Sequence, residues 1–248
     1  MQRNIRLRLE YDGTDFKGWQ VQPDQRTVQG ILETCLSSLL GHPTRAIGAG
    51  RTDAGVHALG QVANFSTINP LPLQRIAAAL NSTLPADVVV LHADEVPPTF
   101  HARRSARRRT YLYRIAYRRR AIGRGQAWHL RSRLNIDAMR SAASRTLGYH
   151  DFTSFCVAST ERENRNCRVF DCTLAGIDDG VRVEISADRF LRSMVRGIVG
   201  TLVQVGRGKR APEAFDAILR ARDRQCAGPN APPQGLFLKE VTYEDPEE

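Results

Sequence analysis

Lysine is scarce in this 248-residue sequence: Lys17, Lys209 and Lys239 are its only lysines, so arginine supplies almost all of the positive charge. Acidic residues are absent from positions 101–136. The five cysteines are odd in number and show no Cys-x-x-Cys spacing, which argues against a disulfide framework and against a zinc site. No apolar run approaches the roughly 20 residues that a transmembrane helix requires.

Residues 1–4 lead directly into an alternating apolar and polar pattern, without the apolar segment of a secretory signal. We therefore expect a soluble, cytoplasmic protein. The hydrophobic content of 42% is enough for a sizeable core, and the length suits one large domain or two closely associated halves.

Positive charge dominates the chain, with a formal net charge of +10 and a pI of about 9.9, which favours an anionic partner. Twelve arginines fall between His101 and Ile136: Arg103, Arg104, Arg107, Arg108, Arg109, Arg114, Arg118, Arg119, Arg120, Arg124, Arg131 and Arg133. Tyr111, Tyr113 and Trp128 are interleaved with them. Arginine binds phosphate through two donors and aromatic rings stack on bases, so the segment predicts a nucleic-acid-binding surface. The alternative is a solvated basic face.

Hydrophobic periodicity predicts an α+β protein with helices packed on a largely antiparallel sheet. In the N-terminal half, strand patterns cover residues 5–11, 61–66 and 88–91, and helical patterns cover residues 28–39 and 73–80. Thr27 is a suitable cap for the first helix, and Gly41 a suitable end.

The C-terminal half repeats this mixture of elements. Strand patterns cover residues 111–117, 167–174, 181–187 and 236–243, and helical patterns cover 136–147, 190–202 and a segment beginning at Pro212. Asn135 is a suitable cap for the helix that Gly148 is expected to end, and Gly206 is expected to end the longer one. We place the two halves at residues 1–105 and 106–248, with no independent linker between them.

The most informative segment is Gly50-Arg51-Thr52-Asp53-Ala54-Gly55-Val56-His57-Ala58. Gly50 and Gly55 allow backbone angles closed to other residues and the close approach of a ligand. Arg51 favours the ionised form of Asp53, which could then act as a nucleophile. A surface turn with a local salt bridge is the alternative.

This nonapeptide resembles the signature of the pseudouridine synthases that act on transfer RNA, the TruA family. Further resemblance lies, in family order, in residues 10–13 with 18–20, 100–103 with 109–115, 151–155, 190–200 and 235–238. Leu112 departs from the family pattern, in which a basic residue is common at this position. Residues 165–167 also depart from it, which bears on a contact to RNA rather than on the chemistry.

The resemblance implies two α+β halves, each similar to an RNA-recognition module, that share one bent mixed sheet. It also implies isomerisation of uridine to pseudouridine at positions 38, 39 and 40 of the tRNA anticodon stem-loop, without a metal or cofactor. Asp53 would be the nucleophile. Three routes stay open: attack on C6 of the uracil, attack on C1′, or assistance in removing a proton from the sugar.

Other site residues follow from the same resemblance. Arg196 would form an ion pair with Asp53, and Tyr111 would stack on the uracil and help to remove the C5 proton. Leu236 would close the pocket, and Arg51 would contact the RNA and hold the target nucleotide out of the stem. The residues alone leave an alternative open for each: Arg196 as a helix-surface side chain without a partner, Tyr111 as a packed strand residue and Leu236 as a core residue.

The partner implied is tRNA, bound by a homodimer, and we expect Arg103, Arg107, Arg108 and Arg109 to contact the RNA backbone. Two other functions remain possible. One is a non-catalytic basic RNA-binding protein. The other is a metal-dependent nuclease using Asp53 and His57, although two ligands fall short of a site and the glycines argue against a helix there.

Overall fold

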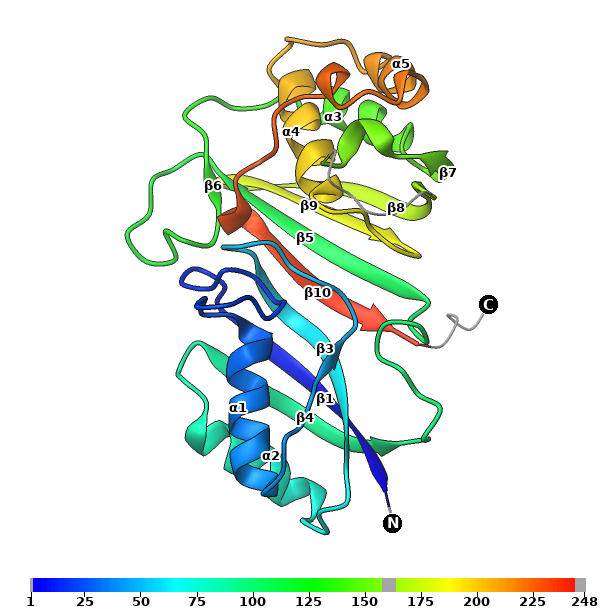
Figure 1. Cartoon of the computed structure of the whole chain (residues 1–248). Coiled ribbons are helices and arrows are strands. Elements are labelled where there is room, and N and C mark those ends of the chain that lie inside the picture. Colours follow the sequence, from blue (N-terminus) through cyan, green and yellow to red (C-terminus); the bar gives the residue numbers. More distant parts are fainter. Residues whose placement is uncertain (1, 158–163, 244–248) are drawn as a thin grey trace. The chain divides into compact units, whose positions relative to one another are not determined.

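The computed structural model describes residues 2–157 and 164–243. Within them the chain forms two compact units: unit 1 contains residues 2–107 and 238–243, and unit 2 contains Arg108–Phe237. Each unit combines an antiparallel sheet with helices (Figure 1). Strand β10 (Leu236–Thr242) begins in unit 2 and ends in unit 1. The predicted α+β class is confirmed.

The sheet of unit 1 has β1 at its centre. Its strands are β1 (Arg3–Tyr11), β2 (Ile47–Gly48), β3 (His57–Thr67) and β4 (Val88–Val96). The order is β4-β1-β3, both β1 pairings are antiparallel, and β2 and the later part of β10 lie beside β3. Ile5, Leu7 and Leu9 are completely buried, because alternate residues of β1 point to the same face of the sheet.

Two helices cover one face of this sheet, α1 (Val28–Leu40) and α2 (Leu73–Thr83) (Figure 1). The Thr27 side chain accepts a hydrogen bond from the Gly30 backbone N–H and caps α1. Gly41 ends the helix with a left-handed φ of 75° and donates its N–H to the Ser37 carbonyl. Both predicted ends of α1 are therefore confirmed.

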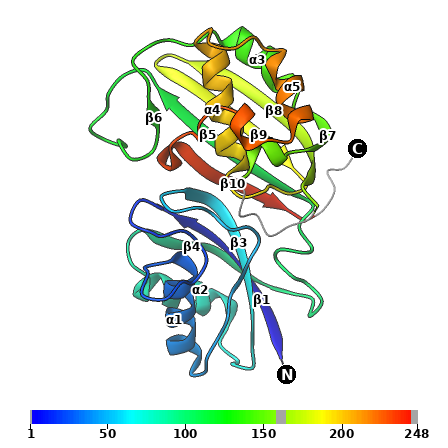
Figure 2. The ribbon, with the colours of Figure 1, turned by 45° about the horizontal axis from the view of Figure 1, so that its top comes forward.

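In unit 2 four strands lie side by side in the order β5-β9-β8-β7, and the pairings between them are antiparallel. The strands of this unit are β5 (Arg108–Ala116), β6 (Trp128–His129), β7 (Gly148–Asp151), β8 (Asn166–Ile177) and β9 (Gly180–Ala187). The short β6 pairs with β5 in parallel, so the sheet is mixed. Helices α3 (Ile136–Ser144), α4 (Met194–Gly206) and α5 (Ala214–Ala221) lie on one face of it (Figure 2).

At two places the predicted helix extends three residues or more beyond the observed one. The third helix stops at Ser144 instead of reaching Leu147, which is 41% exposed, and Gly148 with φ 95° begins β7. The fourth helix begins at Met194 instead of Phe190, because Ser193 has a left-handed φ of 62° that interrupts the helix on its N-terminal side. Both segments are apolar at helical spacing, and that periodicity does not report where the backbone turns.

Among the described residues, no helix has the length and apolar character needed to cross a membrane.

Candidate active site

The Asp53 loop joins β2 to β3 inside unit 1. Its end is a tight turn in which the Val56 N–H donates to the Asp53 carbonyl at 3.1 Å. Gly55 has φ 75°, the positive angle that such a turn requires at its third position. Gly50 does not use a positive φ. The Asp53 side chain is half-buried and Arg51 is exposed.

Hydrogen bonds hold this loop from both sides. The Trp19 N–H donates to the Thr52 carbonyl at 3.1 Å, and the Gly55 N–H donates to the Phe16 carbonyl at 3.2 Å. On the sheet side, the Gln61 side-chain amide donates to the Gly50 carbonyl at 2.8 Å. Asp53 therefore lies between fixed backbone positions, which is the preorganisation that a reacting group needs.

Close backbone contacts add to this hold. A Cβ placed on Gly13 would lie 2.0 Å from the Val56 carbonyl oxygen, and one on Gly18 would lie 2.6 Å from that of Thr52. Gly18 also has φ 95°. Only glycine lets the segment after β1 approach the loop this closely.

Tyr11 supports the loop from the core. Its hydroxyl and that of Thr52 are 2.8 Å apart, and the Gln61 amide donates to Tyr11 Oη at 3.4 Å. Burial raises the pKa of Tyr11 to about 12, an effect that the hydrogen bonds to Thr52 and Gln61 partly oppose. The hydroxyl is therefore a neutral structural link below that pH.

His57 is buried at the start of β3, where the Gly13 N–H donates to its Nδ1 at 3.0 Å. Asp12 Oδ1 lies 3.1 Å from the same nitrogen. Residues 51–56 are not helical, so Asp53 and His57 do not share a helix face. In the described part of the chain no three His, Cys, Asp or Glu side chains come together as potential metal ligands.

Tyr111 lies on β5 in unit 2, opposite Ile185 of β9, and is 8% exposed. The Tyr111 ring packs edge-to-face against the Phe190 ring, with the ring centroids 5.0 Å apart. Tyr113, two residues along the strand, is completely buried and donates its hydroxyl to the Pro232 carbonyl at 2.8 Å. Tyr113 is thus a packed sheet residue, as its position on the strand predicts.

Arg196 lies in the first turn of α4 and is half-buried. Its Nε donates to the Ala231 carbonyl at 2.8 Å. A cation near a helix N-terminus is disfavoured by about 0.3 to 1 kcal/mol, so helix electrostatics do not explain its position. Leu236 begins β10, directly after the short helix η3 (Pro233–Gly235), and is 5% exposed.

The arginines expected to contact RNA differ in their surroundings. Arg103 and Arg107 are exposed. Arg108 forms an ion pair with Asp171 at 3.3 Å, and Arg109 is buried and donates to the Asp188 carbonyl at 2.7 Å. Arg103 and Arg107 are therefore the more accessible pair for a phosphate.

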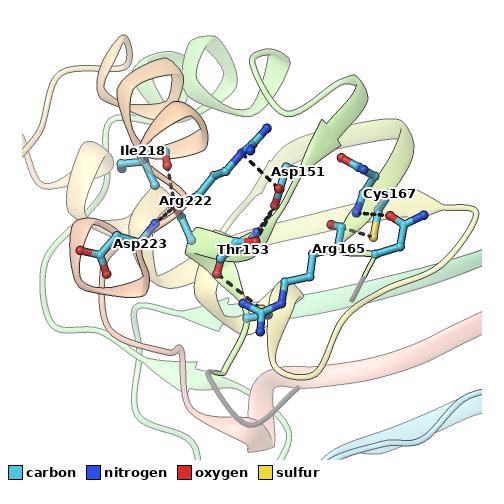
Figure 3. Close-up of polar contacts among 11 residues, drawn as sticks. Asp151, Thr153, Arg165, Cys167, Ile218, Arg222 and Asp223 are labelled. Carbon is cyan, nitrogen blue, oxygen red and sulfur yellow. Dashed lines mark hydrogen bonds and ion pairs between the residues drawn. The ribbon is translucent and has the colours of Figure 1, made fainter. Parts of the chain in front are cut away.

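A polar network in unit 2 lies beside the end of α5 (Figure 3). Asp151 Oδ1 accepts from both the N–H and the hydroxyl of Thr153, while Oδ2 lies 3.2 Å from Nε of Arg222. The buried Ser154 hydroxyl donates to the Ile218 carbonyl and accepts from the Asp223 N–H. These bonds fix the short helix η1 (Thr153–Phe155) to the end of α5.

Helix η1 in turn contacts the helix that carries Arg196. A Cβ on Gly197 would lie 2.8 Å from the Phe155 carbonyl oxygen. The network therefore supports α4 from the side of η1, which is a structural reason for the Asp-Phe-Thr-Ser-Phe motif at residues 151–155.

Some of these features were not found from the sequence. Nothing in the sequence around Gly13 and Gly18 indicates that these glycines contact the Asp53 loop. Residues 226–235 were predicted only as a loop rich in glycine and proline, with no indication of their contact with Arg196. The pairing of Phe190 with Tyr111 was missed because Phe190 fitted the helical pattern.

The chain is similar along almost all of its length to known proteins. A sequence family described as tRNA pseudouridine synthase matches residues 9–103 and 142–244, so Tyr111 falls between the two matched segments. A protein named tRNA pseudouridine synthase A from Geotalea uraniireducens is 43% identical over 243 residues, which cover 97% of this chain and 100% of that protein. Proteins of the same name from Thermoanaerobacter sp. and Moorella thermoacetica are 44% and 46% identical, and the matches cover 97% and 96% of this chain and 100% and 99% of theirs. Asp53 and Arg196 both lie inside the matched segments. Because the matches cover almost its whole length, this chain belongs to the tRNA pseudouridine synthase family.

Proposed function

We propose that this protein is an isomerase that converts uridine to pseudouridine in tRNA, at positions 38, 39 and 40 of the anticodon stem-loop, with Asp53 as the nucleophile. The full-length similarity to proteins named tRNA pseudouridine synthase A supports the reaction and the substrate. The rigid Asp53 loop is the single structural observation that supports Asp53 as the reacting residue.

The reaction breaks the bond between C1′ and N1 and forms one between C1′ and C5. The C5 hydrogen leaves as a proton, and N1 gains a proton, so the product is an isomer and no cosubstrate is consumed. Asp53 is held by hydrogen bonds of its neighbours to Trp19 and Phe16, so little reorganisation is needed when the nucleotide arrives. Attack at C6, attack at C1′ and assisted loss of a sugar proton all use the same carboxylate.

Arg196 and Tyr111 complete the proposal. Arg196 is the ion-pair partner of Asp53, because a cation favours the ionised carboxylate in a site from which water is excluded. Tyr111 stacks on the uracil and takes part in removing the C5 proton, with Leu236 closing the pocket. Arg51, which is exposed beside Asp53, holds the extracted nucleotide.

RNA binding rests on arginine. Besides the more accessible Arg103 and Arg107, the segment between β5 and β6 exposes a basic loop, residues 118–125. Arg120 forms an ion pair with Asp179, whereas Arg119 and Arg124 make no ion pair within the described residues. These two guanidinium groups suit phosphate contacts along a tRNA held by a cytoplasmic homodimer.

The test replaces Asp53 by Asn, which keeps the size of the side chain and removes its charge. We expect loss of tritium release from tRNA carrying 5-tritiated uridine, with tRNA binding retained in a filter assay. Asp15→Asn, at an exposed acid of the same unit, is the control for the change in net charge and should react normally. A normal rate for Asp53→Asn would rule out Asp53 as the nucleophile.

The position of modification has its own test. Pseudouridine is mapped in tRNA from cells with and without the gene, and from cells carrying Asp53→Asn. Loss at positions 38, 39 and 40 in the last two supports the assignment. Loss elsewhere in tRNA would keep the reaction and change the site. Unchanged tRNA together with retained RNA binding would favour the non-catalytic RNA-binding protein instead.

A further inference from the structure

We propose that residues 227–235, which we name the strap, position Arg196 for the reaction, and that Gly200 is the residue on which the seating of the strap depends. The strap runs from the short helix η2 (Arg224–Cys226) to the start of β10 and includes η3. This inference rests on the proposed function, in which Arg196 acts on Asp53. Gly200 and the strap residues are positioning residues.

The strap binds the backbone and the side chain of Arg196 through one residue. The Ala231 N–H donates to the Arg196 carbonyl at 2.9 Å, and Arg196 Nε donates to the Ala231 carbonyl at 2.8 Å. Ala231 is completely buried. Because the guanidinium is planar, a bond at Nε also orients the two Nη atoms that carry its other four N–H donors.

This arrangement fixes Arg196 within unit 2. A free arginine side chain has about 2 kcal/mol of rotamer entropy to lose when it becomes ordered. Where the strap orders the side chain during folding, that cost does not fall on substrate binding or on the transition state. The position of Arg196 in the first turn of α4, where the helix dipole disfavours a cation, is consistent with a placement set by the strap.

Gly200 lets the strap reach α4. It lies one turn after Arg196 on the helix, and a Cβ there would lie 1.8 Å from the Pro229 carbonyl oxygen and 3.2 Å from the Ala231 nitrogen. A distance of 1.8 Å between non-bonded atoms is impossible, so any side chain at this position must displace the strap.

A second pair of hydrogen bonds fastens the strap further along the helix. The Gly228 N–H donates to the buried Thr201 hydroxyl at 2.9 Å. That hydroxyl donates to the Gly197 carbonyl at 2.8 Å. The strap therefore follows α4 from Thr201 to Arg196, with Gly200 at the closest approach.

The far end of the strap contacts β5, the strand of Tyr111. Tyr113 donates its hydroxyl to the Pro232 carbonyl at 2.8 Å, and a Cβ on Gly235 would lie 2.6 Å from the Tyr113 ring. Burial raises the pKa of Tyr113, and the positive charge of Arg196 opposes this rise, in keeping with their proximity. The strap thus connects Arg196 to β5 and leads directly into Leu236, the first residue of β10.

The first experiment is Gly200→Ala, assayed by tritium release from tRNA under single-turnover and steady-state conditions. We expect kcat to fall by on the order of 100-fold, the effect of a misplacement of about 1 Å, while KM for tRNA changes less than about 2-fold. Gly208→Ala is the matched control: Gly208 lies two residues after the end of α4, has φ 68°, and no atom of the described residues lies within 4 Å of a methyl group placed on it, so kcat should be unchanged. An unchanged kcat for Gly200→Ala would overturn the proposal.

The second experiment separates positioning from general damage. Arg196→Ala, Gly200→Ala and the double variant form a thermodynamic cycle. If Gly200 acts through Arg196, the double variant is about as slow as Arg196→Ala. If the two losses multiply, Gly200 acts by another route and the strap proposal fails. If Arg196→Ala alone keeps its normal kcat, the proposed role of Arg196 fails first, and the role of the strap fails with it.

Should Gly200→Ala not fold, Tyr113→Phe decides the matter. It removes only the hydroxyl that binds Pro232 and adds no atoms, so the fold is kept. We expect a roughly 5-fold fall in kcat, the equivalent of one hydrogen bond, with KM for tRNA unchanged. The proposal is refuted by a normal kcat, or by a rise in KM with kcat unaltered.

Discussion

The close contact between Gly18 and the Asp53 loop leads to a quantitative prediction for Gly18→Ala. Two costs add at this position. An L-residue at a left-handed φ such as the 95° of Gly18 costs about 1 to 2 kcal/mol. The new methyl would also lie 2.6 Å from the Thr52 carbonyl oxygen and 3.2 Å from the Asp53 carbonyl carbon, and overpacking of this kind costs about 1 to 3 kcal/mol. The two costs sum to about 2 to 5 kcal/mol, and we expect the free energy of unfolding to fall by this amount.

The same contact predicts a loss of activity. Relieving it from 2.6 Å to the 3.4 Å at which ordinary contact begins requires the loop to move by about 0.8 Å. Because Thr52 precedes Asp53 directly, the carboxylate moves with it. A displacement of about 1 Å can lower a rate by about 100-fold, so we expect kcat to fall by tens to a hundredfold.

Gly41→Ala isolates the backbone cost. Gly41 is in the same unit and has φ 75°, and within the described part of the chain no atom lies within 4 Å of a methyl group placed on it. It should lose about 1 kcal/mol of stability and keep full activity. Urea unfolding and tritium release from tRNA measure the two quantities. Equal losses of stability in the two variants, together with normal kcat in both, would show that the Gly18 contact does not position Asp53.

Three further predictions concern other parts of the chain. Burial raises the pKa of Tyr11 from 10.0 to about 12, so the unfolded chain loses this proton first, and stability that is complete below pH 10 should fall by about 2 to 3 kcal/mol as the pH rises to 12. Tyr11→Phe should flatten that part of the urea-unfolding profile, and an identical slope would contradict the assignment. Ser154→Ala leaves the Ile218 carbonyl and the Asp223 N–H without their buried partner and should cost about 1 to 3 kcal/mol in urea unfolding, whereas a loss below about 0.5 kcal/mol would mean that the bonds are replaced. Replacing both Arg119 and Arg124 of the basic loop by Gln should lower the slope of log Kd for tRNA against log salt by about 1 to 2 without changing kcat, and an unaltered slope would remove the loop from the RNA-binding surface.

Local signals in the sequence were sufficient for most elements. Thr27 and Gly41 set the ends of α1 because capping uses only neighbouring residues and a local backbone angle. The alternating apolar residues of β1 and the turn between β8 and β9 are equally local. The errors at Leu147 and Phe190 arose because each apolar residue continued the helical spacing beyond the observed helix. Phe190 packs instead against the distant Tyr111, and Leu147 is 41% exposed.

The candidate site divides in the same way. The residues around Asp53 were found from the sequence because a charged pair flanked by glycines, in a motif shared by a family, is contiguous in the chain. The contacts that hold that loop were found only in the tertiary structure. Gly18 lies more than thirty residues from Asp53 in the sequence, and its neighbours do not indicate which carbonyl it approaches.

The sequence by itself determined the α+β class, most of the helices and strands, the excess of arginine over acid, and the chemical identity of the residues proposed to react. The tertiary structure decided how Arg196 is held, because Ala231 reaches its side chain from a segment thirty-five residues further along. Spacing along a chain predicts periodic structure, whereas contacts between distant backbone atoms depend on the path of the whole unit. The role of a glycine such as Gly200 is therefore visible only from the backbone atoms that pack against it.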